Sequence, residues 1–441
     1  MTLIPRRTVL RSTAALGLLA LGAGRATATP ADDAADGFVY GYAPVTVART
    51  RADAVARSGT NFLARQPVLA TPRSTVVVAP NVDTLYCSAW LDLRDGPVQL
   101  SIPDGGDRFR LFQLLDIWTN TIANVGTRTT GQGAGRFVVV PPGWTGTPPS
   151  GAMVIRATSW DVWLIGRTLV RGPDDVAAAR AVQRSYALTT LPGAPSSPPP
   201  RLPSTMSGDP QNPADQGVVF FDQLAAILAA DPPPAADAPM LSRLAALGVT
   251  PGSTPSTGPS AAVLAAGVTA GTALVSARPA STPSGTWFTS LDLGAYGTDY
   301  LLRAATARRA LAANLPAESL YYGSGDDALG NPLTGTLTYR LRLPTPPPCA
   351  ATGFWSFTMY GEDMFLVDNP IDRYAIGDRT AGLARDDDGS LDLYVGATAP
   401  AGHESNWLPA PSGPFVLMAR IYSPTEAALS GAWHPPAFEP L

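Results

Sequence analysis

Polar and aromatic side chains gather between residues 79 and 135, among apolar runs that are typical of buried strands. Carboxylates can serve as general acid and base, and aromatic and amide side chains beside them would hold a polar ligand. The alternative is that these residues cap turns and satisfy backbone groups of a large β core. The stretch supplies the catalytic candidates Asp83 and Asp116 and the ligand-binding candidates Tyr86, Trp118, Asn120 and Arg128.

Two interpretations stay open for most of these residues. Asn81 follows a proline, where Asn or Asp commonly bonds to the turn backbone, and this explains Asn81 better than Asp83. Tyr86 falls close to alternating apolar positions, so it also fits a simple core residue. Arg128 lies in a loop of Gly and Thr, where it would bind a carboxylate or sulfate, or pair with Asp116.

Asp116, Trp118 and Asn120 would share one face if a strand continued through them. A carboxylate, an indole and an amide on one face would form the wall of a sugar site or another polar-ligand site. In the alternative, the strand ends here, with Asp116 capping it, Trp118 in the core and Asn120 in a turn.

A second group of charged and aromatic residues lies between residues 354 and 411. Asp372 begins a stretch with two carboxylates and two guanidiniums within eight residues, which indicates internal ion pairs or, alternatively, a carboxylate pair for glycoside hydrolysis. His403, beside Glu404, would be a general base or an ordinary surface residue. The candidates here are Asp372 and His403 for catalysis and Tyr360, Arg373, Asn406 and Trp407 for ligand binding.

Short apolar runs separated by Gly and Pro turns predict most of the elements that would position these residues. Helices are expected over residues 36–57, 173–191, 220–228, 239–247, 260–277 and 299–314. Strands are expected over residues 75–79, 85–93, 97–102, 108–116, 136–142, 151–157 and 162–168, and again over 336–343, 353–361, 364–368, 391–396 and 414–423.

This order predicts a mainly β fold with some α, in which short helices bridge two β-sandwich or jelly-roll-like domains. The expected divisions are a first β-rich domain at 36–191, a Pro-rich connector and helical bridge at 192–298, and a second β-rich domain at 299–437. The bridging helices are too short to be stable alone, so we expect them to pack across both halves, with the ligand site at the junction.

The amino-acid composition excludes several classes of reaction and partner. The chain of 441 residues has 45 Pro, 42 Gly and 15 % charged residues, which favours a turn-rich β protein. It contains no lysine, which excludes Schiff-base chemistry and the phosphate-binding lysine of P-loops. A net charge of −4 and the lack of a basic run beyond the N-terminus argue against nucleic acid as a partner. Two Cys and two His cannot build a zinc site of the usual thiolate spacing, so we expect no metal and no organic cofactor.

Residues 1–28 have the features of an export signal. Arg6 and Arg7 precede an apolar core at residues 13–24, and a small-residue cleavage site follows at 26–28. Paired arginines favour the twin-arginine route over the general secretory route, and the apolar core is too short to span a bilayer. We therefore expect a secreted, periplasmic or envelope protein in which Cys87 and Cys349 are buried thiols or, alternatively, one disulfide.

Several motifs resemble a known two-domain bacterial family. Residues 81–86, 116–120, 128–131 and 163–168 resemble domain of unknown function 1254, and residues 354–360, 369–374, 376–379, 388–391 and 406–411 resemble domain of unknown function 1214. The resemblance covers residues 36–436 and implies a β-rich, often exported protein with no agreed reaction. It supplies no catalytic residues.

We therefore predict an exported, hydrolase-like enzyme that acts without a cofactor on a small-molecule or glycan-like substrate. The alternative is a non-catalytic ligand-binding or envelope-associated protein. The sequence carries no indication of the oligomeric state.

Overall fold

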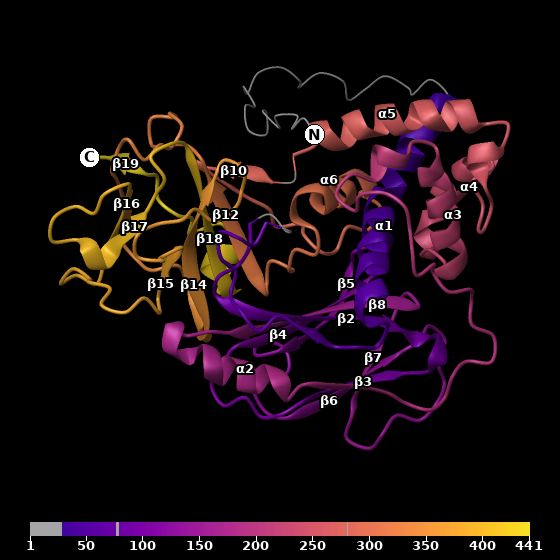
Figure 1. The fold of residues 1–441 in the computed structure, drawn as a ribbon, viewed down its shortest axis with the longest axis horizontal. Helices are drawn as coiled ribbons and strands as arrows, with labels where there is room; N and C mark the ends of the chain where they lie inside the picture. The colour runs from indigo at the N-terminus through magenta and orange to yellow at the C-terminus, as the bar shows by residue number, and fades with distance from the viewer. Residues whose placement is uncertain (1–28, 76–78, 280) are drawn as a thin grey trace.

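The computed structural model describes residues 29–75, 79–279 and 281–441. The predicted signal peptide and most of the predicted strand at 75–79 lie outside these residues. The described chain is mostly β, with four sheets and a group of helices, as the sequence predicted (Figure 1).

Two sheets form the N-terminal β part. Sheet 1 has the order β1-β2-β8-β4-β5, and its strands are antiparallel: Ala64–Arg65, Thr84–Asp92, Asp161–Leu169, Arg110–Asp116 and Thr121–Gly126. Sheet 2 has the order β7-β6-β3-β9, with strands Met153–Arg156, Gly135–Val140, Val98–Ile102 and Ala187–Thr190. Leu91 and Phe112 of sheet 1 share one core with Val139 and Ile155 of sheet 2. The core therefore occupies one face of each sheet and leaves the other face of sheet 1 open to other partners.

Two further sheets form the C-terminal β part. Sheet 3 has the order β10-β11-β12-β18-β14-β15, with strands Thr282–Ser284, Trp287–Thr289, Ser319–Ser324, Phe415–Pro424, Cys349–Gly361 and Ala375–Gly377. Sheet 4 has the order β17-β16-β13-β19, with strands Trp407–Pro409, Leu391–Gly396, Tyr339–Leu343 and Glu439–Pro440. Phe357 and Ile421 of sheet 3 pack with Leu341 and Val395 of sheet 4 in a separate core.

The helices surround α1 (Pro30–Ser58), which starts at a capping box formed by Thr29 and Asp32. α3 (Val219–Ala230), α4 (Ala238–Ala246), α5 (Ala261–Ala277) and α6 (Tyr300–Ala310) pack around it above the open face of sheet 1 (Figure 1). A Cβ at Gly41 would lie 2.8 Å from Leu224, so α3 approaches α1 where α1 has no side chain. Two tryptophans of the N-terminal β part also belong to this helical core. Trp90 comes from β2, and Trp118 comes from the turn after β4.

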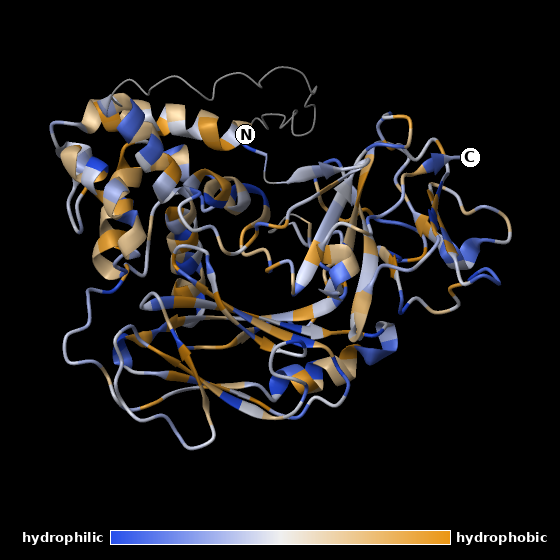
Figure 2. Cartoon of the chain, turned by 180° about the vertical axis from the view of Figure 1, so that it is seen from behind, coloured by the Kyte–Doolittle hydropathy of each residue, from blue (hydrophilic) through white to orange (hydrophobic). Residues whose placement is uncertain are grey.

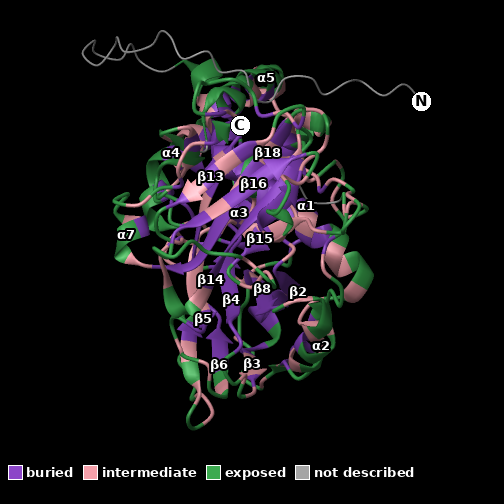
Figure 3. Cartoon of the chain, turned by 90° about the vertical axis from the view of Figure 1, so that its left-hand side faces the viewer, coloured by how far each residue is buried: buried purple, intermediate pink, exposed green. Residues whose placement is uncertain are grey.

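This helical group differs from the bridge that we expected. Its core contains no residue of sheet 3 or sheet 4, so the helices cover α1 and sheet 1 rather than packing across both halves. The two β parts instead touch each other directly. Figure 2 shows apolar residues along the strands and on the helices around α1, and Figure 3 shows the strands buried while α2, α4 and α5 are exposed on the outside.

Most predicted strands and helices are present, with shifted ends, but two segments fold differently from the prediction and several strands were not predicted, such as β5 at 121–126. The helix expected at 173–191 ends early: α2 (Val176–Arg184) stops, and residues 187–190 become β9, paired with β3. The run at 364–368 is a loop, and β12 at 319–324 lies where no strand was predicted. α7 is Glu426–Leu429, and the short 3-10 turns are Leu93–Asp95, Pro173–Asp175, Pro213–Gln216, Ala235–Asp237, Pro255–Thr257 and Glu404–Asn406.

Candidate functional site

The segment at residues 79–83 joins the two β parts. Its carbonyl groups accept hydrogen bonds from sheet 3: Arg420 Nη2 donates to Ala79 O at 2.9 Å, and the Tyr360 hydroxyl donates to Pro80 O at 2.7 Å. Asn81 Nδ2 donates to the Tyr422 hydroxyl. Asn81 Oδ1 accepts from the backbone N–H of Asp83 at 2.5 Å, which is the turn bond predicted for an Asn in this position.

Asp83 is a buried ionic tie between the halves. Its Oδ1 accepts a hydrogen bond from Arg379 Nη2 at 2.7 Å, and its Oδ2 accepts from Ser356 Oγ at 2.7 Å. Arg379 Nη1 also donates to Asp378 Oδ1 at 2.7 Å. Both oxygens of Asp83 are thus occupied by partners from the C-terminal part, which assigns this carboxylate a structural task.

Aromatic rings complete the contact between sheets 1 and 3. Phe354 and Tyr422 of sheet 3 stack with ring centroids 4.1 Å apart, and Phe109, which precedes β4, meets both edge-on. At another point of the junction Arg128 Nη2 lies 2.6 Å from Glu318 Oε1, and the Glu318 side chain is 1 % exposed. Arg128 therefore pairs across the junction, with Glu318 rather than Asp116.

Between these ties lies a cluster that we call the arginine–tyrosine cluster, formed by Arg167, Tyr86, Tyr321 and Tyr422. Tyr86 of β2 and Arg167 of β8 are paired in register, so both side chains project from the open face of sheet 1. The Arg167 guanidinium lies over the Tyr86 ring, 5.3 Å from its centroid. Tyr321 and Tyr422 come from sheet 3, where β12 and β18 are neighbours.

Arg167 is a buried cation without a carboxylate partner. It is 6 % exposed, and it donates to Gln113 Oε1 at a long 3.3 Å. It forms no ion pair within the described chain, and the residues outside that range contain no Asp or Glu. Burial acts to lower the pKa of Arg167, but the phenols of Tyr86, Tyr321 and Tyr422 outweigh it and raise the pKa. The group is therefore a charged donor with unused hydrogen-bonding capacity.

The phenols of the cluster differ in their partners. Tyr321 accepts a hydrogen bond from Asn314 Nδ2 at 2.7 Å, and Tyr422 accepts from Asn81. Burial, then the neighbouring phenols Tyr86 and Tyr321, raise the pKa of Tyr422 well above its usual range, so Tyr422 stays protonated. Tyr86 and Tyr321 are half-buried, so water reaches this part of the junction.

Two other buried arginines also lack an ion pair within the described chain. Arg420 donates to Thr358 Oγ1 at 2.8 Å and to the Tyr360 hydroxyl at 2.7 Å, besides Ala79 O. Arg303 donates to Tyr40 O at 2.9 Å, lies against three aromatic rings and leaves its Nε without a partner. Arg167 differs from both because it lies beside the half-buried phenols of Tyr86 and Tyr321, where water reaches the junction.

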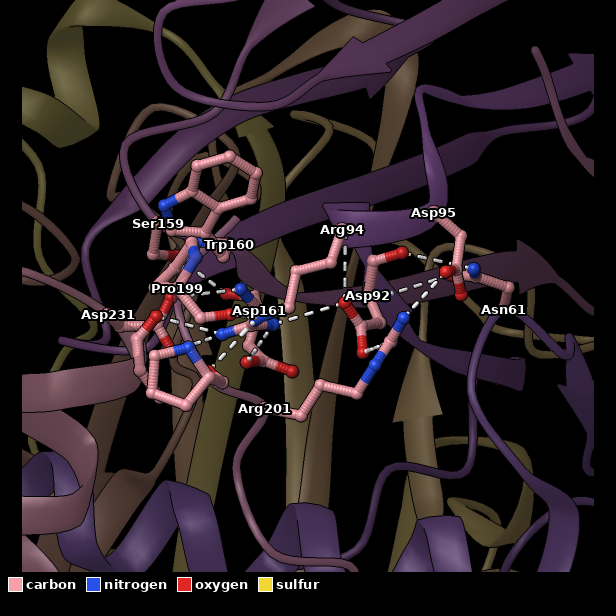
Figure 4. Close-up of polar contacts among 12 residues, drawn as sticks. Asn61, Asp92, Arg94, Asp95, Ser159, Trp160, Asp161, Pro199, Arg201 and Asp231 are labelled. Carbon is pink, nitrogen blue, oxygen red and sulfur yellow. Dashed lines mark hydrogen bonds and ion pairs between the residues drawn. The ribbon is translucent and has the colours of Figure 1, made fainter. Parts of the chain in front are cut away.

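A separate concentration of charge, formed by other side chains, is a structural ion-pair network (Figure 4). Arg94 Nη1 lies 3.1 Å from Asp92 Oδ1 and 2.9 Å from Asp161 Oδ2, and Arg51 Nε lies 2.6 Å from Asp161 Oδ1. Asp231 Oδ1 accepts from the backbone N–H of Asp161 at 3.0 Å. These contacts fasten α1 and the end of α3 to the ends of β2 and β8, and Arg51 and Arg94 are each paired with an aspartate.

The predicted wall of Asp116, Trp118 and Asn120 does not form, because the chain turns after Asp116. Thr119 has a positive φ of 69°, and β5 then runs back along β4. Asp116 Oδ1 accepts from the Asn120 backbone N–H at 2.8 Å, and Trp118 lies in the helical core. Burial raises the pKa of Asp116. The strand-end alternative therefore describes this segment.

The candidates of the second group are distributed between the junction and the loops of the C-terminal part. Tyr360 faces the junction, as described above. Asp372 accepts from the Tyr374 hydroxyl at 2.8 Å in an exposed loop, and His403 is an exposed residue whose ring lies 4.4 Å from that of Tyr394. The other three hold loops of this part: Arg373 donates to Trp407 O, Asn406 Nδ2 donates to Ala384 O, and Trp407 Nε1 donates to Gly396 O.

Sequence reasoning did not select Arg167, Gln113, Tyr321 or Tyr422. Arg167 follows the apolar run at residues 162–165 of β8, and a charge in such a strand is the signal that could have found it. Tyr321 and Tyr422 reach the cluster only through the packing of sheet 3 against sheet 1, which no local pattern reports.

Neither a metal site nor a membrane-spanning helix is found among the residues that the structure describes. No group of three or more His, Cys, Asp or Glu there is arranged to hold a metal ion, and no helix there has the length and apolarity needed to cross a membrane. Cys87 is a buried free thiol and Cys349 a half-buried one, so the structure has two unpaired thiols rather than a disulfide.

The fold and site define a two-part β protein with an unpaired arginine between its sheets. Residues 60–190 match a protein family described as "Protein of unknown function (DUF1254)", and residues 318–426 match "Protein of unknown function (DUF1214)". The chain belongs to the family in which these two domains follow each other in this order. A search among curated proteins gave no match.

A solved structure shares the fold. The crystal structure of the VPA0106 protein from Vibrio parahaemolyticus is 25 % identical to this chain, covers 94 % of it over 100 % of its own length, and superimposes with a TM-score of 0.74. A putative uncharacterized protein from Burkholderia cenocepacia is 13 % identical, with coverages of 92 % and 88 % and a TM-score of 0.46, too low to support an argument.

Proposed function

We propose that this protein binds a small organic anion between sheets 1 and 3, with Arg167 as the anchoring cation. The observation that carries the proposal is a buried guanidinium with no ion pair in the described chain, whose side-chain partners are Gln113, at a long 3.3 Å, and the Tyr86 phenol. An uncompensated buried charge is costly, and an anionic ligand would remove that cost. The phenols of Tyr86 and Tyr321 are placed to donate further hydrogen bonds to the same anion.

This proposal favours the binding protein over the enzyme among the two functions expected from sequence. The carboxylates predicted to be catalytic are engaged elsewhere: Asp83 is tied to Arg379 and Ser356, and Asp116 caps the turn at Asn120. A general acid or base needs a free lone pair or proton at the substrate.

The test is isothermal titration calorimetry with acetate, benzoate, sulfate and phosphate, on the parent protein and on Arg167→Gln. We expect at least one anion to bind the parent, and Arg167→Gln to weaken that binding roughly ten- to a hundredfold, as for loss of a charged hydrogen bond. Arg136→Gln is the matched control, because Arg136 is an exposed arginine on sheet 2. Equal binding by all three proteins, or no binding by any, contradicts the proposal.

A second candidate function is hydrolysis with Asp378 as the general acid at the junction. Burial raises the pKa of Asp378, which lies on Arg379 Nη1. A protonated Asp378 would provide the acid. A glycoside and ester panel tests this: Asp378→Asn should abolish any turnover by the parent, and turnover that survives in Asp378→Asn removes this candidate.

Two further proposals come from the sequence and the sheets. We propose that the chain is exported through the twin-arginine route; Arg6→Lys with Arg7→Lys should then leave precursor in the cytoplasm, whereas normal export would point to the general secretory route. We also propose that each pair of sheets is a sandwich of jelly-roll type, which is supported by the single core that each pair shares.

A further inference from the structure

We infer that the anion bound at Arg167 carries an extended apolar body, and that the ligand is an aliphatic monocarboxylate of medium chain length. The inference rests on the proposed function and specifies its ligand. It comes from the side chains that continue from Arg167 along the open face of sheet 1.

An apolar row leads away from the cation. Trp163 and Ile165 precede Arg167 at alternate positions of β8, so all three project from the same face of the strand. Arg167 lies four positions after Trp163 in the strand, which is about 13 Å at ~3.3 Å per position. Tyr86, Leu115 and Ala312 pack with Ile165 and Trp163 in one cluster.

This row remains partly open to water although Ala312, which follows α6, packs on it. Trp163 and Tyr86 are half-buried, whereas Ile165 and Leu115 are buried. Trp163 is held in place: it stacks on Trp90 with ring centroids 4.6 Å apart, and its Nε1 donates to Ser88 Oγ at 2.9 Å. The indole is therefore a fixed, partly exposed apolar surface at the far end of the row from the guanidinium.

The single positive charge of the arginine–tyrosine cluster favours a ligand with one negatively charged group. Arg167 is its single cation, and its other members are neutral phenols, so a monoanion is balanced, whereas a second negative charge would lack a partner. A carboxylate matches the fork of a guanidinium in two parallel hydrogen bonds. A linear chain then follows β8 over Ile165 to Trp163.

The experiment is a calorimetric titration of the full mature chain with acetate, hexanoate and decanoate. Decanol and decyltrimethylammonium serve as probes with the same chain and no negative charge. We expect affinity to rise with chain length, by up to about fourfold for each methylene that is fully buried. Decanoate should bind at least about tenfold more tightly than decanol or the ammonium compound, because only the carboxylate pairs with Arg167.

Three variants locate the effect. Arg167→Gln should reduce the affinity for decanoate to that for decanol, and Arg136→Gln should change neither. Tyr86→Phe keeps the ring and removes one hydroxyl, so it should weaken decanoate binding severalfold if Arg167→Gln fails to fold. The comparison among the probes on the parent protein needs no variant at all.

The outcomes distinguish a failure of the anion site at Arg167 from a failure of the apolar binding row. If acetate or benzoate binds at Arg167 as tightly as decanoate, the anion site stands and the apolar body is refuted. If decanol binds as tightly as decanoate, the row binds apolar chains without Arg167, and the inference is refuted. If no anion binds, both the inference and the proposed function are refuted.

Discussion

Asp83 provides the sharpest test of how the two β parts are held together. Its carboxylate is 5 % exposed and receives hydrogen bonds of 2.7 Å from Arg379 and from Ser356, both of the C-terminal part. Asp83→Asn keeps the volume of the side chain and removes its charge. The amide can still accept one of the two hydrogen bonds, so the perturbation is mainly the loss of an ionic contact across the junction.

The loss of unfolding free energy depends on the contact with Asp378 that Arg379 keeps in this variant. Removing one partner of a fully buried ion pair costs about 3–5 kcal/mol, because the other charge is left uncompensated. Arg379 is 18 % exposed and keeps its 2.7 Å contact with Asp378, so the cost should be lower. We expect Asp83→Asn to lower the free energy of unfolding by about 2 kcal/mol, near the value of one charged hydrogen bond.

Urea unfolding followed by circular dichroism measures this value, with Asp378→Asn as the matched control. The Asp378 side chain is 30 % exposed and burial already raises its pKa, so neutralising it should cost about 1 kcal/mol or less. The parent should unfold in one transition because the junction couples both parts. The reasoning is refuted if the two variants are equally stable, or if the parent protein unfolds in two separate steps.

Three more variants test other parts of the structure. Asp175→Asn should lower stability by about 1 kcal/mol at pH 7, since hydrogen bonding to Arg108 holds the Asp175 pKa below its usual value; the deficit must fade as the pH falls through that lowered pKa, and a deficit that persists there contradicts the assignment. Gly166→Ala should cost about 1–3 kcal/mol in urea unfolding, because its Cβ would lie 2.4 Å from Cys87 Sγ; an unchanged midpoint contradicts the close packing. Arg94→Leu, in the network of Figure 4, should cost at least about 3 kcal/mol in the same assay, and a neutral result would mean that its buried aspartates are protonated.

The sequence predicted the class of fold because alternation and turn residues act locally. The runs at 85–93, 162–168 and 391–396 became β2, β8 and β16 with small shifts. The errors have tertiary causes. Residues 187–190 have helical neighbours but pair with β3, and the segment after Asp116 turns because β5 returns along β4. Local propensity does not report either pairing.

The candidate site, too, depends on tertiary contacts that the sequence does not report. Asp83, Arg128 and Tyr360 were selected from sequence and do contact the opposite half, through Arg379, Glu318 and Pro80. Their partners occupy them, and this could not be foreseen from spacing along the chain. Arg167 stands out only after the packing of sheet 3 against sheet 1 is known, because a charge in a strand is ordinarily paired when the sheet is covered.

The central claim is that Arg167 receives an organic anion between sheets 1 and 3, and a crystal structure with a bromine-labelled alkanoate tests it most directly. We predict a carboxylate within hydrogen-bond distance of the Arg167 guanidinium and an anomalous bromine peak displaced from it along β8, toward Trp163. A carboxylate bound elsewhere on the protein, with Arg167 paired to a protein carboxylate, would contradict the account.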